Sequence, residues 1–231
     1  MPIVKKLLSK IPYRWQMELK RLHFRRQINK NTFLTSEPEF KILNELIRPG
    51  DWVIDIGANV GHYTKRFSEL VGPKGRVIAI EPVPATFSLL AANVQLFTYA
   101  NVTLFNIAIS DKMEIVGISI PKFSSGMTNY YQAHLTSSSD SEFSVLTLPL
   151  DSLDIRQRIG LVKIDAEGHE SFVLAGMRKL IEASHPILIV ETESEQLIRG
   201  LEEMGYHSEK MKNSPNYLFK SLTRERHRTP T

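Results

Sequence analysis

Apolar and polar residues along this chain follow two patterns, one typical of strands and one typical of helices. Residues 52–56 and 76–80 are short apolar runs bounded by turn residues, as expected for strands buried in a sheet. Between them, residues 62–71 carry apolar side chains at helical spacing, and the Gly and Pro residues of 72–75 end that helix. The order strand, helix, strand predicts a βαβ unit with parallel strands.

The same alternation continues toward the C-terminus. We predict strands at 102–107, 161–165 and 186–191, helices at 84–97, 168–183 and 193–204, and a terminal β pair within 206–220. Before the first strand, Ser36 and Glu39 resemble a capping box, and Pro38 suits the first turn of a helix through residue 47. The chain is therefore predicted to have an α/β fold, with a mostly parallel seven-stranded sheet and helices on both faces.

One region departs from this alternation. Two β-rich runs, 114–121 and 143–150, flank a serine-rich segment that contains Ser124, Ser125 and residues 137–141. We expect residues 113–150 to form a hairpin or lid inserted before the strand at 161–165.

The N-terminal residues predict a basic, amphipathic helical arm, residues 1–36, ahead of a main domain at 37–220 and a polar tail at 221–231. Pro12 should divide the arm into two helical pieces. Its apolar residues recur at helical spacing: Val4, Leu8, Ile11, Trp15, Leu19 and Leu22. We favour packing of this stripe on the domain. The alternative is that residues 1–30 bind a membrane surface or an acidic partner.

The distribution of charge along the chain limits the partners that we expect. Residues 1–30 hold nine Lys or Arg and one acidic residue, Glu18, so the rest of the chain is mildly acidic although the net charge is +4. An acidic body does not suit nucleic acid, and we expect no nucleic-acid partner. The chain has no cysteine and no apolar run of the roughly 20 residues that span a bilayer. We expect a cytoplasmic protein, with peripheral membrane contact as an alternative.

The first candidate site follows the strand at 52–56. Asp55 is followed by a glycine turn, Gly57-Ala58-Asn59-Val60-Gly61, and the second strand ends at Glu81-Pro82. Such a turn lets a ligand approach the backbone, and an acid at the tip of the second strand can accept ribose hydroxyls. Asp55 would repel a pyrophosphate but suits the ammonium and sulfonium groups of S-adenosylmethionine. The pattern therefore favours S-adenosylmethionine over a nicotinamide dinucleotide.

Each residue of this site has an expected role. The backbone of Gly57, Ala58 and Asn59 should face the methionine part of the donor, and Asp55 should bind its ammonium directly or through water. Glu81 should bind the ribose hydroxyls.

The adenine should lie farther along the sheet. Asn106 and Ala108, which follow the strand at 102–107, should border it. For Asn106, a simple turn role is an equal alternative.

The second candidate site follows the strand at 161–165. The run Lys163-Ile-Asp165-Ala-Glu167-Gly168-His169-Glu170 places three carboxylates and a histidine where open α/β sheets bind ligands. If the donor's methyl group goes to a hydroxyl oxygen, that hydroxyl benefits from a general base that takes its proton. Asp165 is our first candidate for this base and His169 the second. Glu167 and Glu170 would orient the substrate or simply offset the dipole at the start of a helix.

A less favoured alternative is a magnesium site. Asp165 and Glu191 end strands that should be neighbours, so their carboxylates could converge on Mg²⁺. The remaining histidines considered show no regular ligand spacing and are assigned no site: His62, His134, His185 and His207.

Taken together, these motifs resemble the FkbM family of S-adenosylmethionine-dependent methyltransferases. Besides the two site motifs, the resemblance rests on residues 106–111, 186–191 and 216–219, and it covers most of 37–220. It implies a Rossmann-like class I methyltransferase fold, S-adenosylmethionine as donor, and an oxygen acceptor on a sugar, glycan or small metabolite. The arm, the lid segment and the tail lie outside it.

Two other functions remain open. A nicotinamide-dependent oxidoreductase could use the same βαβ unit, but the glycine pattern and the lack of a Tyr-x-x-x-Lys pair disfavour it. A non-catalytic module could bind S-adenosylmethionine and dock through its basic arm. The presence of Asp55, Gly57, Gly61 and Glu81 favours an enzyme.

Overall fold

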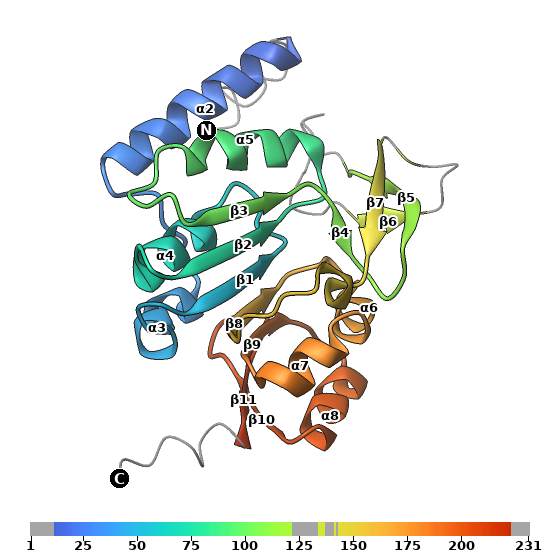
Figure 1. Cartoon of the computed structure of the whole chain (residues 1–231). Helices are drawn as coiled ribbons and strands as arrows, with labels where there is room; N and C mark the ends of the chain where they lie inside the picture. Colours follow the sequence, from blue (N-terminus) through green and yellow to red (C-terminus); the bar gives the residue numbers. More distant parts are fainter. Residues whose placement is uncertain (1–11, 122–133, 137–140, 142, 223–231) are drawn as a thin grey trace.

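The computed structural model describes residues 12–121, 134–136, 141 and 143–222, and it confirms the predicted fold class. The main sheet has seven strands in the order β10-β11-β9-β8-β1-β2-β3 (Figure 1). Five of them run parallel, and β11 is antiparallel to both of its neighbours. The strands are β1 Trp52–Ile56, β2 Arg76–Ile80, β3 Val102–Phe105, β8 Ile159–Ile164, β9 Ile187–Glu191, β10 Tyr206–Lys210 and β11 Asn216–Ser221.

Helices cover both faces of this sheet because alternate strand residues point to opposite sides. Val53, Val77 and Leu161 pack with α3 (Pro38–Leu46) and α4 (His62–Val71). On the other face, Ile54 and Val162 belong to a second core, which three helices cover. These helices are α6 Glu170–Ala175, α7 Arg178–Ser184 and α8 Glu195–Glu203. On the α4 side of the sheet, α5 (Pro84–Val94) packs Leu90 against Ala79 of β2.

The structure corrects several predicted boundaries. The predicted helix at 168–183 is two short helices, α6 and α7, separated at Gly176 and Met177. A β-carbon on Gly176 would lie 1.9 Å from the carbonyl oxygen of Ser110, so the chain breaks the helix where it touches another segment. The third strand ends at Phe105, and α5 ends at Val94.

The predicted capping box is wrong. Glu37, not Ser36, precedes α3, and no side chain caps that helix. Glu39 is 1 % exposed and accepts a hydrogen bond from Asn216 of β11, far away in the sequence. Glu39 is in the first turn of α3, but its side chain bonds to β11 instead of capping the helix.

The two β-rich runs form a second sheet beside the first, with the order β4-β7-β5-β6. Its strands are β4 Ala108–Ile109, β5 Glu114–Ser119, β6 His134–Thr136 and β7 Phe143–Leu148. The predicted hairpin is present, since β5 and β7 pair antiparallel. Ser124, Ser125 and residues 137–140 of the predicted lid lie outside the described residues.

The arm contributes one described helix, α2 (Tyr13–Asn29), which begins directly after Pro12, as the proline break predicts. Its buried residues, Met17 and Ile28, join the core that lies under α5. The favoured packing of the apolar stripe is contradicted for the part that is described, because Trp15, Leu19 and Leu22 are exposed. Residues 1–11 and 223–231 lie outside the described residues.

Candidate active site

A cavity lies at the carboxyl ends of β1, β2 and β8, the edge where open α/β sheets bind ligands. The second sheet closes it with residues of β4, β5 and β6. The predicted site residues that line it are Gly57, Asn59, Glu81, Pro82, Ala108, Asp165, Glu167 and His169. The two sequence motifs therefore meet in one cavity.

The glycine turn is shaped by contact with the end of β8. Gly57 has φ +77°, and a β-carbon there would lie 1.9 Å from the carbonyl oxygen of Asp165. The amides of Gly57 and Ala58 both donate to the carbonyl oxygen of Ile80, at 3.0 Å each. These bonds fix the turn against β2. Ala58 and Gly61 support it without lining the cavity, and Gly61 precedes α4 with φ +98°.

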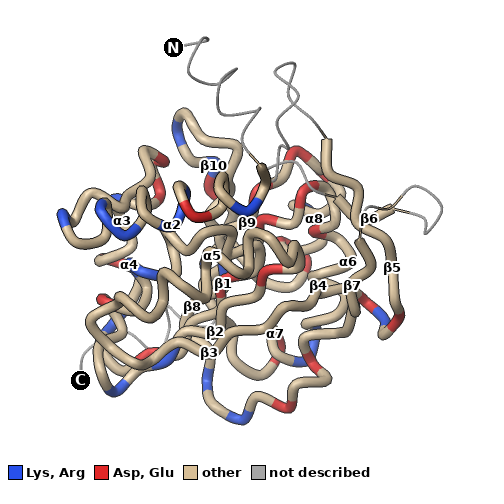
Figure 2. Tube along the Cα trace, turned by 90° about the horizontal axis from the view of Figure 1, so that it is seen from above, with Lys and Arg blue, Asp and Glu red and all other residues tan. Residues whose placement is uncertain are grey.

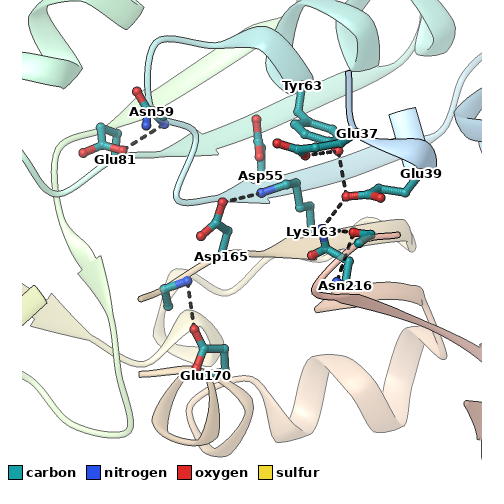
Figure 3. Close-up of polar contacts among 12 residues, drawn as sticks. Glu37, Glu39, Asp55, Asn59, Tyr63, Glu81, Lys163, Asp165, Glu170 and Asn216 are labelled. Carbon is teal, nitrogen blue, oxygen red and sulfur yellow. Dashed lines mark hydrogen bonds and ion pairs between the residues drawn. The ribbon is translucent and has the colours of Figure 1, made fainter. Parts of the chain in front are cut away.

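Glu81 is held rigidly at the tip of β2. Its Oε2 accepts a hydrogen bond from the amide of Asn59 and its Oε1 from the amide of Val83, both at 2.9 Å (Figure 3). Burial raises the pKa of Glu81 to about 7, although the two amide bonds oppose this shift. Each carboxylate oxygen can accept a further hydrogen bond, so Glu81 can also bind a diol in the cavity.

Asn106 connects two loops. Its Nδ2 donates to the carbonyl oxygens of Glu81 at 2.8 Å and Pro82 at 3.0 Å, and it does not line the cavity. This geometry favours the turn role for Asn106. The apolar wall beside Glu81 comes from Val83, Ile107 and Ala108 instead.

Asp55 lies beneath the turn and outside the cavity lining. It is fully buried, and its Oδ2 accepts a hydrogen bond from Thr64 Oγ1 at 2.6 Å. Its Oδ1 has no hydrogen-bond partner among the described residues. Burial raises the pKa of Asp55, against the opposing effect of Lys163. This position does not support direct contact between Asp55 and a ligand.

Lys163 supplies a buried cation beside the cavity, a role that the sequence pattern does not predict. Its Nζ lies 3.0 Å from Asp165 Oδ2 and 4.8 Å from the ring centroid of Tyr63 (Figure 3). Burial would lower the pKa of Lys163, but the carboxylates of Asp165 and Asp55 outweigh it and raise that pKa. The spacing of two residues was the available signal, since residues i and i+2 of a strand share a face.

A buried polar network continues from Lys163 to α3 and β11. The hydroxyl of Tyr63 lies 2.5 Å from Glu37 Oε2 and 3.1 Å from Glu39 Oε1. Glu39 also accepts a hydrogen bond from Asn216 Nδ2. Burial and these two carboxylates raise the pKa of Tyr63, which therefore stays protonated. The network ties four elements together behind the cavity.

Glu167 lies between the cavity and a second depression, which it also lines. Its φ of +50° turns the chain sharply after β8. The second depression is rich in acidic side chains: Glu167, Glu170, Glu191 and Glu193. Burial first, and then neighbouring carboxylates, raise the pKa of Glu167 and Glu191 to about 7. Figure 2 shows acidic positions gathered around β9, α6 and α8.

His169 is oriented by a serine. Its Nε2 lies 2.9 Å from Ser110 Oγ, which donates to Asp111 Oδ1 at 3.1 Å. With the only hydroxyl proton of Ser110 on Asp111, the His169 tautomer that completes this chain carries its hydrogen on Nε2 and a lone pair on Nδ1. The ring stacks on Phe172 with centroids 4.6 Å apart. Burial lowers the pKa of His169, so the ring is neutral at pH 7.

Glu170 has a structural role. Its Oε1 accepts hydrogen bonds from the amides of Ala166 at 3.2 Å and Gly168 at 3.0 Å, which holds the turn before α6.

The magnesium alternative finds no support. Asp165 is paired with Lys163, and no group of three metal-binding side chains occurs among the residues described.

His134, which we had assigned to no site, lines the cavity from β6 together with Leu135, and Ile118 joins them from β5. No local pattern marks His134, because only the pairing of β5 with β6 brings it to the cavity.

The comparisons with known proteins agree with this architecture. The model of the family described as "Methyltransferase FkbM domain" matches residues 55–208. The solved structure of the FkbM methyltransferase from Methylobacillus flagellatus KT superposes with a TM-score of 0.55 at 17 % identity. That alignment covers 78 % of this chain and 50 % of the other.

Two curated proteins share parts of the sequence. Ribosomal RNA large subunit methyltransferase E of Methanothermobacter thermautotrophicus is 36 % identical over 73 residues, which is 29 % of this chain and 34 % of that protein. Methyltransferase 1 of Beauveria bassiana is 23 % identical over 145 residues, covering 54 % of this chain and 58 % of its own. The matched parts thus span about a third and somewhat more than half of these relatives.

Proposed function

Since this chain belongs to the FkbM methyltransferase family, we propose that it transfers a methyl group from S-adenosylmethionine to a hydroxyl of a sugar, glycan or other small metabolite. The observation that carries the proposal is the cavity at the carboxyl edge of the sheet. There, Gly57, Glu81 and Asp165 approach one another from three different strands.

The residues present fit an adenosyl donor. The Glu81 carboxylate is positioned for a ribose diol, and the apolar side chains of Val83, Ile107 and Ala108 provide a wall for a flat base. Gly57 lets the turn pass close to the Asp165 carbonyl at the end of β8, where a β-carbon would not fit. Asp165, at the opposite side of the turn, would face the methionine end of the donor.

Methyl transfer needs positioning more than charge stabilisation. S-adenosylmethionine would supply an electrophilic methyl group on a sulfonium, and the displaced sulfur becomes neutral. The chain must then align the acceptor oxygen in line with that methyl and accept the proton of the hydroxyl.

The sequence pattern makes Asp165 and His169 the candidate bases, but the geometry at the cavity favours a third residue, Glu167. Asp165 is held by an ion pair with Lys163, which suits it to a positioning role. Glu167, with a pKa of about 7, is matched to proton transfer near neutral pH. His169 is neutral and offers Nδ1, so it is the second candidate.

The acidic depression beside Glu167 supports a neutral acceptor. Carboxylates bind hydroxyl groups well, whereas four glutamates around one depression repel phosphates. We therefore place a neutral polyhydroxylated acceptor ahead of nucleic acid, although one matched relative is named as an rRNA methyltransferase.

Calorimetry and a methyl-transfer assay test this function. The full chain should bind S-adenosylhomocysteine and S-adenosylmethionine with micromolar affinity or better, and should bind NAD at least about a hundredfold more weakly. A panel of neutral sugars, sugar phosphates and RNA, incubated with methyl-labelled donor, should yield label on the neutral sugars.

The outcomes separate the alternatives. Tighter binding of NAD would replace the methyltransferase with an oxidoreductase. Donor binding with label only on RNA would retain the enzyme class but overturn the acceptor class.

A further inference from the structure

The outer face of α2 is apolar and exposed. Trp15, Leu19 and Leu22 lie four and then three residues apart, so the helical repeat places them on one side of the helix. Their exposed fractions are 55 %, 44 % and 50 %. Single exposed apolar residues are common on proteins, but a contiguous stripe that contains a tryptophan marks an interaction surface.

Packing against the domain does not account for this stripe. In Figure 1, α2 lies along α5 on the side away from the main sheet. Met17 and Ile28 form the buried face of the helix, and Arg21 Nη2 donates to Ser88 Oγ of α5 at 2.8 Å. The helix is therefore already docked by one face while Trp15 points elsewhere.

The positive charge around the stripe favours an anionic partner. Residues 13–30 hold six Lys or Arg and a single acidic residue, Glu18, which pairs with Arg21. The guanidinium of Arg14 lies 5.7 Å from the centroid of the Trp15 ring. Arg26 follows Leu22 by four residues and shares the outer face. An apolar stripe with cationic flanks fits an anionic lipid surface.

A second copy of this chain fits the same surface less well. Two α2 helices packed stripe to stripe would bring Arg14, Arg25 and Arg26 of both copies together, and like charges across an interface disfavour association. A bilayer with anionic headgroups neutralises these cations and also accepts the apolar side chains.

We propose that α2 is a peripheral anchor for anionic phospholipid membranes. Trp15, Leu19 and Leu22 lie in the boundary between headgroups and acyl chains, and the neighbouring arginines bind the headgroups. The anchor lies in the plane of the interface. No described helix is long and apolar enough to cross a bilayer.

Vesicle sedimentation with the full chain tests the anchor. Vesicles of phosphatidylcholine that contain phosphatidylglycerol should pellet the protein at least about tenfold more strongly than phosphatidylcholine alone, and added salt should weaken that binding. The triple variant Trp15→Ala, Leu19→Ala, Leu22→Ala should lose about tenfold or more of the affinity. Met204→Ala, which removes an exposed apolar side chain beyond α8, is the matched control and should bind as the wild type does.

Tryptophan fluorescence gives a second readout. The chain has two tryptophans, so Trp52→Phe leaves Trp15 as the reporter. Its emission should shift to the blue with anionic vesicles, and lipids brominated on the acyl chain should quench it. Neither assay needs a methyl acceptor, so the result is independent of the cavity's activity.

Equal pelleting by the wild type and the triple variant overturns the proposal, as does an unchanged Trp15 emission. A wild type that forms dimers in solution, with the triple variant monomeric and neither bound to vesicles, assigns the stripe to a second copy and also overturns it.

Discussion

Lys163 Nζ lies 3.0 Å from Asp165 Oδ2, with the lysine in β8 and the aspartate directly after it. The side chain of Lys163 is only 4 % exposed, whereas that of Asp165 is 31 % exposed and lines the cavity. The buried ammonium thus fixes a carboxylate at the cavity wall, and it also faces the buried Asp55. Lys163 is a positioning residue for Asp165.

Replacing Lys163 should destabilise the fold. Lys163→Met leaves Asp55 and Asp165 without their cation, and removing one partner of a buried pair costs about 3–5 kcal/mol. Urea unfolding measures the loss. The double variant Lys163→Met, Asp165→Asn should recover part of it, because one uncompensated charge is removed. A double variant no more stable than Lys163→Met would show that this pair carries no coupling.

Donor affinity should rise with pH through Glu81. The proposed contact with the ribose hydroxyls needs the ionised carboxylate, and burial raises the pKa of Glu81 to about 7. Between pH 6 and pH 8 the affinity for S-adenosylhomocysteine should therefore increase by up to about tenfold. Calorimetry across this range checks it. Glu81→Gln should bind more weakly with a flat profile, and an unchanged slope in that variant would contradict the assignment.

The same group should make the free protein less stable as pH rises. The folded-state pKa of Glu81 lies above the ordinary glutamate value of 4.5, so folding favours the protonated form. Stability should fall between about pH 4.5 and pH 7, by up to about 3 kcal/mol from this residue. Thermal unfolding at pH 5 and pH 8 measures the difference, which should shrink in Glu81→Gln. Part of the difference should remain in that variant, because the pKa values of Glu167 and Glu191 are also raised to about 7.

Glu167 should control turnover. Glu167→Gln removes the proposed proton acceptor, so kcat should fall by about a hundredfold or more while donor affinity is retained. In the wild type, kcat should rise with pH and level off above about 7, because the carboxylate must be ionised.

Glu193→Gln is the matched control, since Glu193 lines the acidic depression but not the donor cavity. If Glu167→Gln turns over normally and His169→Asn does not, the base is His169.

Gly57 and Gly72 form a matched pair for a backbone test. Both have positive φ, +77° and +66°, so alanine at either position should cost about 1–3 kcal/mol in backbone strain. Of these two glycines, Gly57 alone would place its β-carbon against another atom, the Asp165 carbonyl oxygen. Gly57→Ala should therefore be the less stable variant by urea unfolding and should also lose donor affinity. Equal losses would mean that the contact with Asp165 is easily relieved.

Local chemistry was enough to predict much of the fold. The helix α4 has the predicted bounds, because glycines punctuate both of its ends. The strand tips that carry Glu81 and Asp165 also converge as expected, since parallel strands end at one edge. Both predictions rest on short-range patterns that the tertiary structure did not overrule.

Contacts between distant segments could not be predicted from one sequence. Gly176 breaks the helix at 168–183 because it touches Ser110. His134 reaches the cavity only through the pairing of β5 with β6. Trp15 has helical spacing that was consistent with burial, yet α5 is covered by Met17 and Ile28 instead. In each case the deciding partner lies elsewhere in the chain.

The separation of the cavity wall into its own sheet has an evolutionary consequence. Gly57 and Glu81 follow strands of the seven-stranded sheet, whereas Ile118, His134 and Leu135 come from β5 and β6 of the smaller one. Mutations can therefore remodel that wall without disturbing Gly57 or Glu81. If this wall contacts the acceptor, we expect substrate repertoire and cofactor chemistry to diverge independently in this architecture, and exchanging β5–β7 between relatives would change acceptor choice without changing the donor.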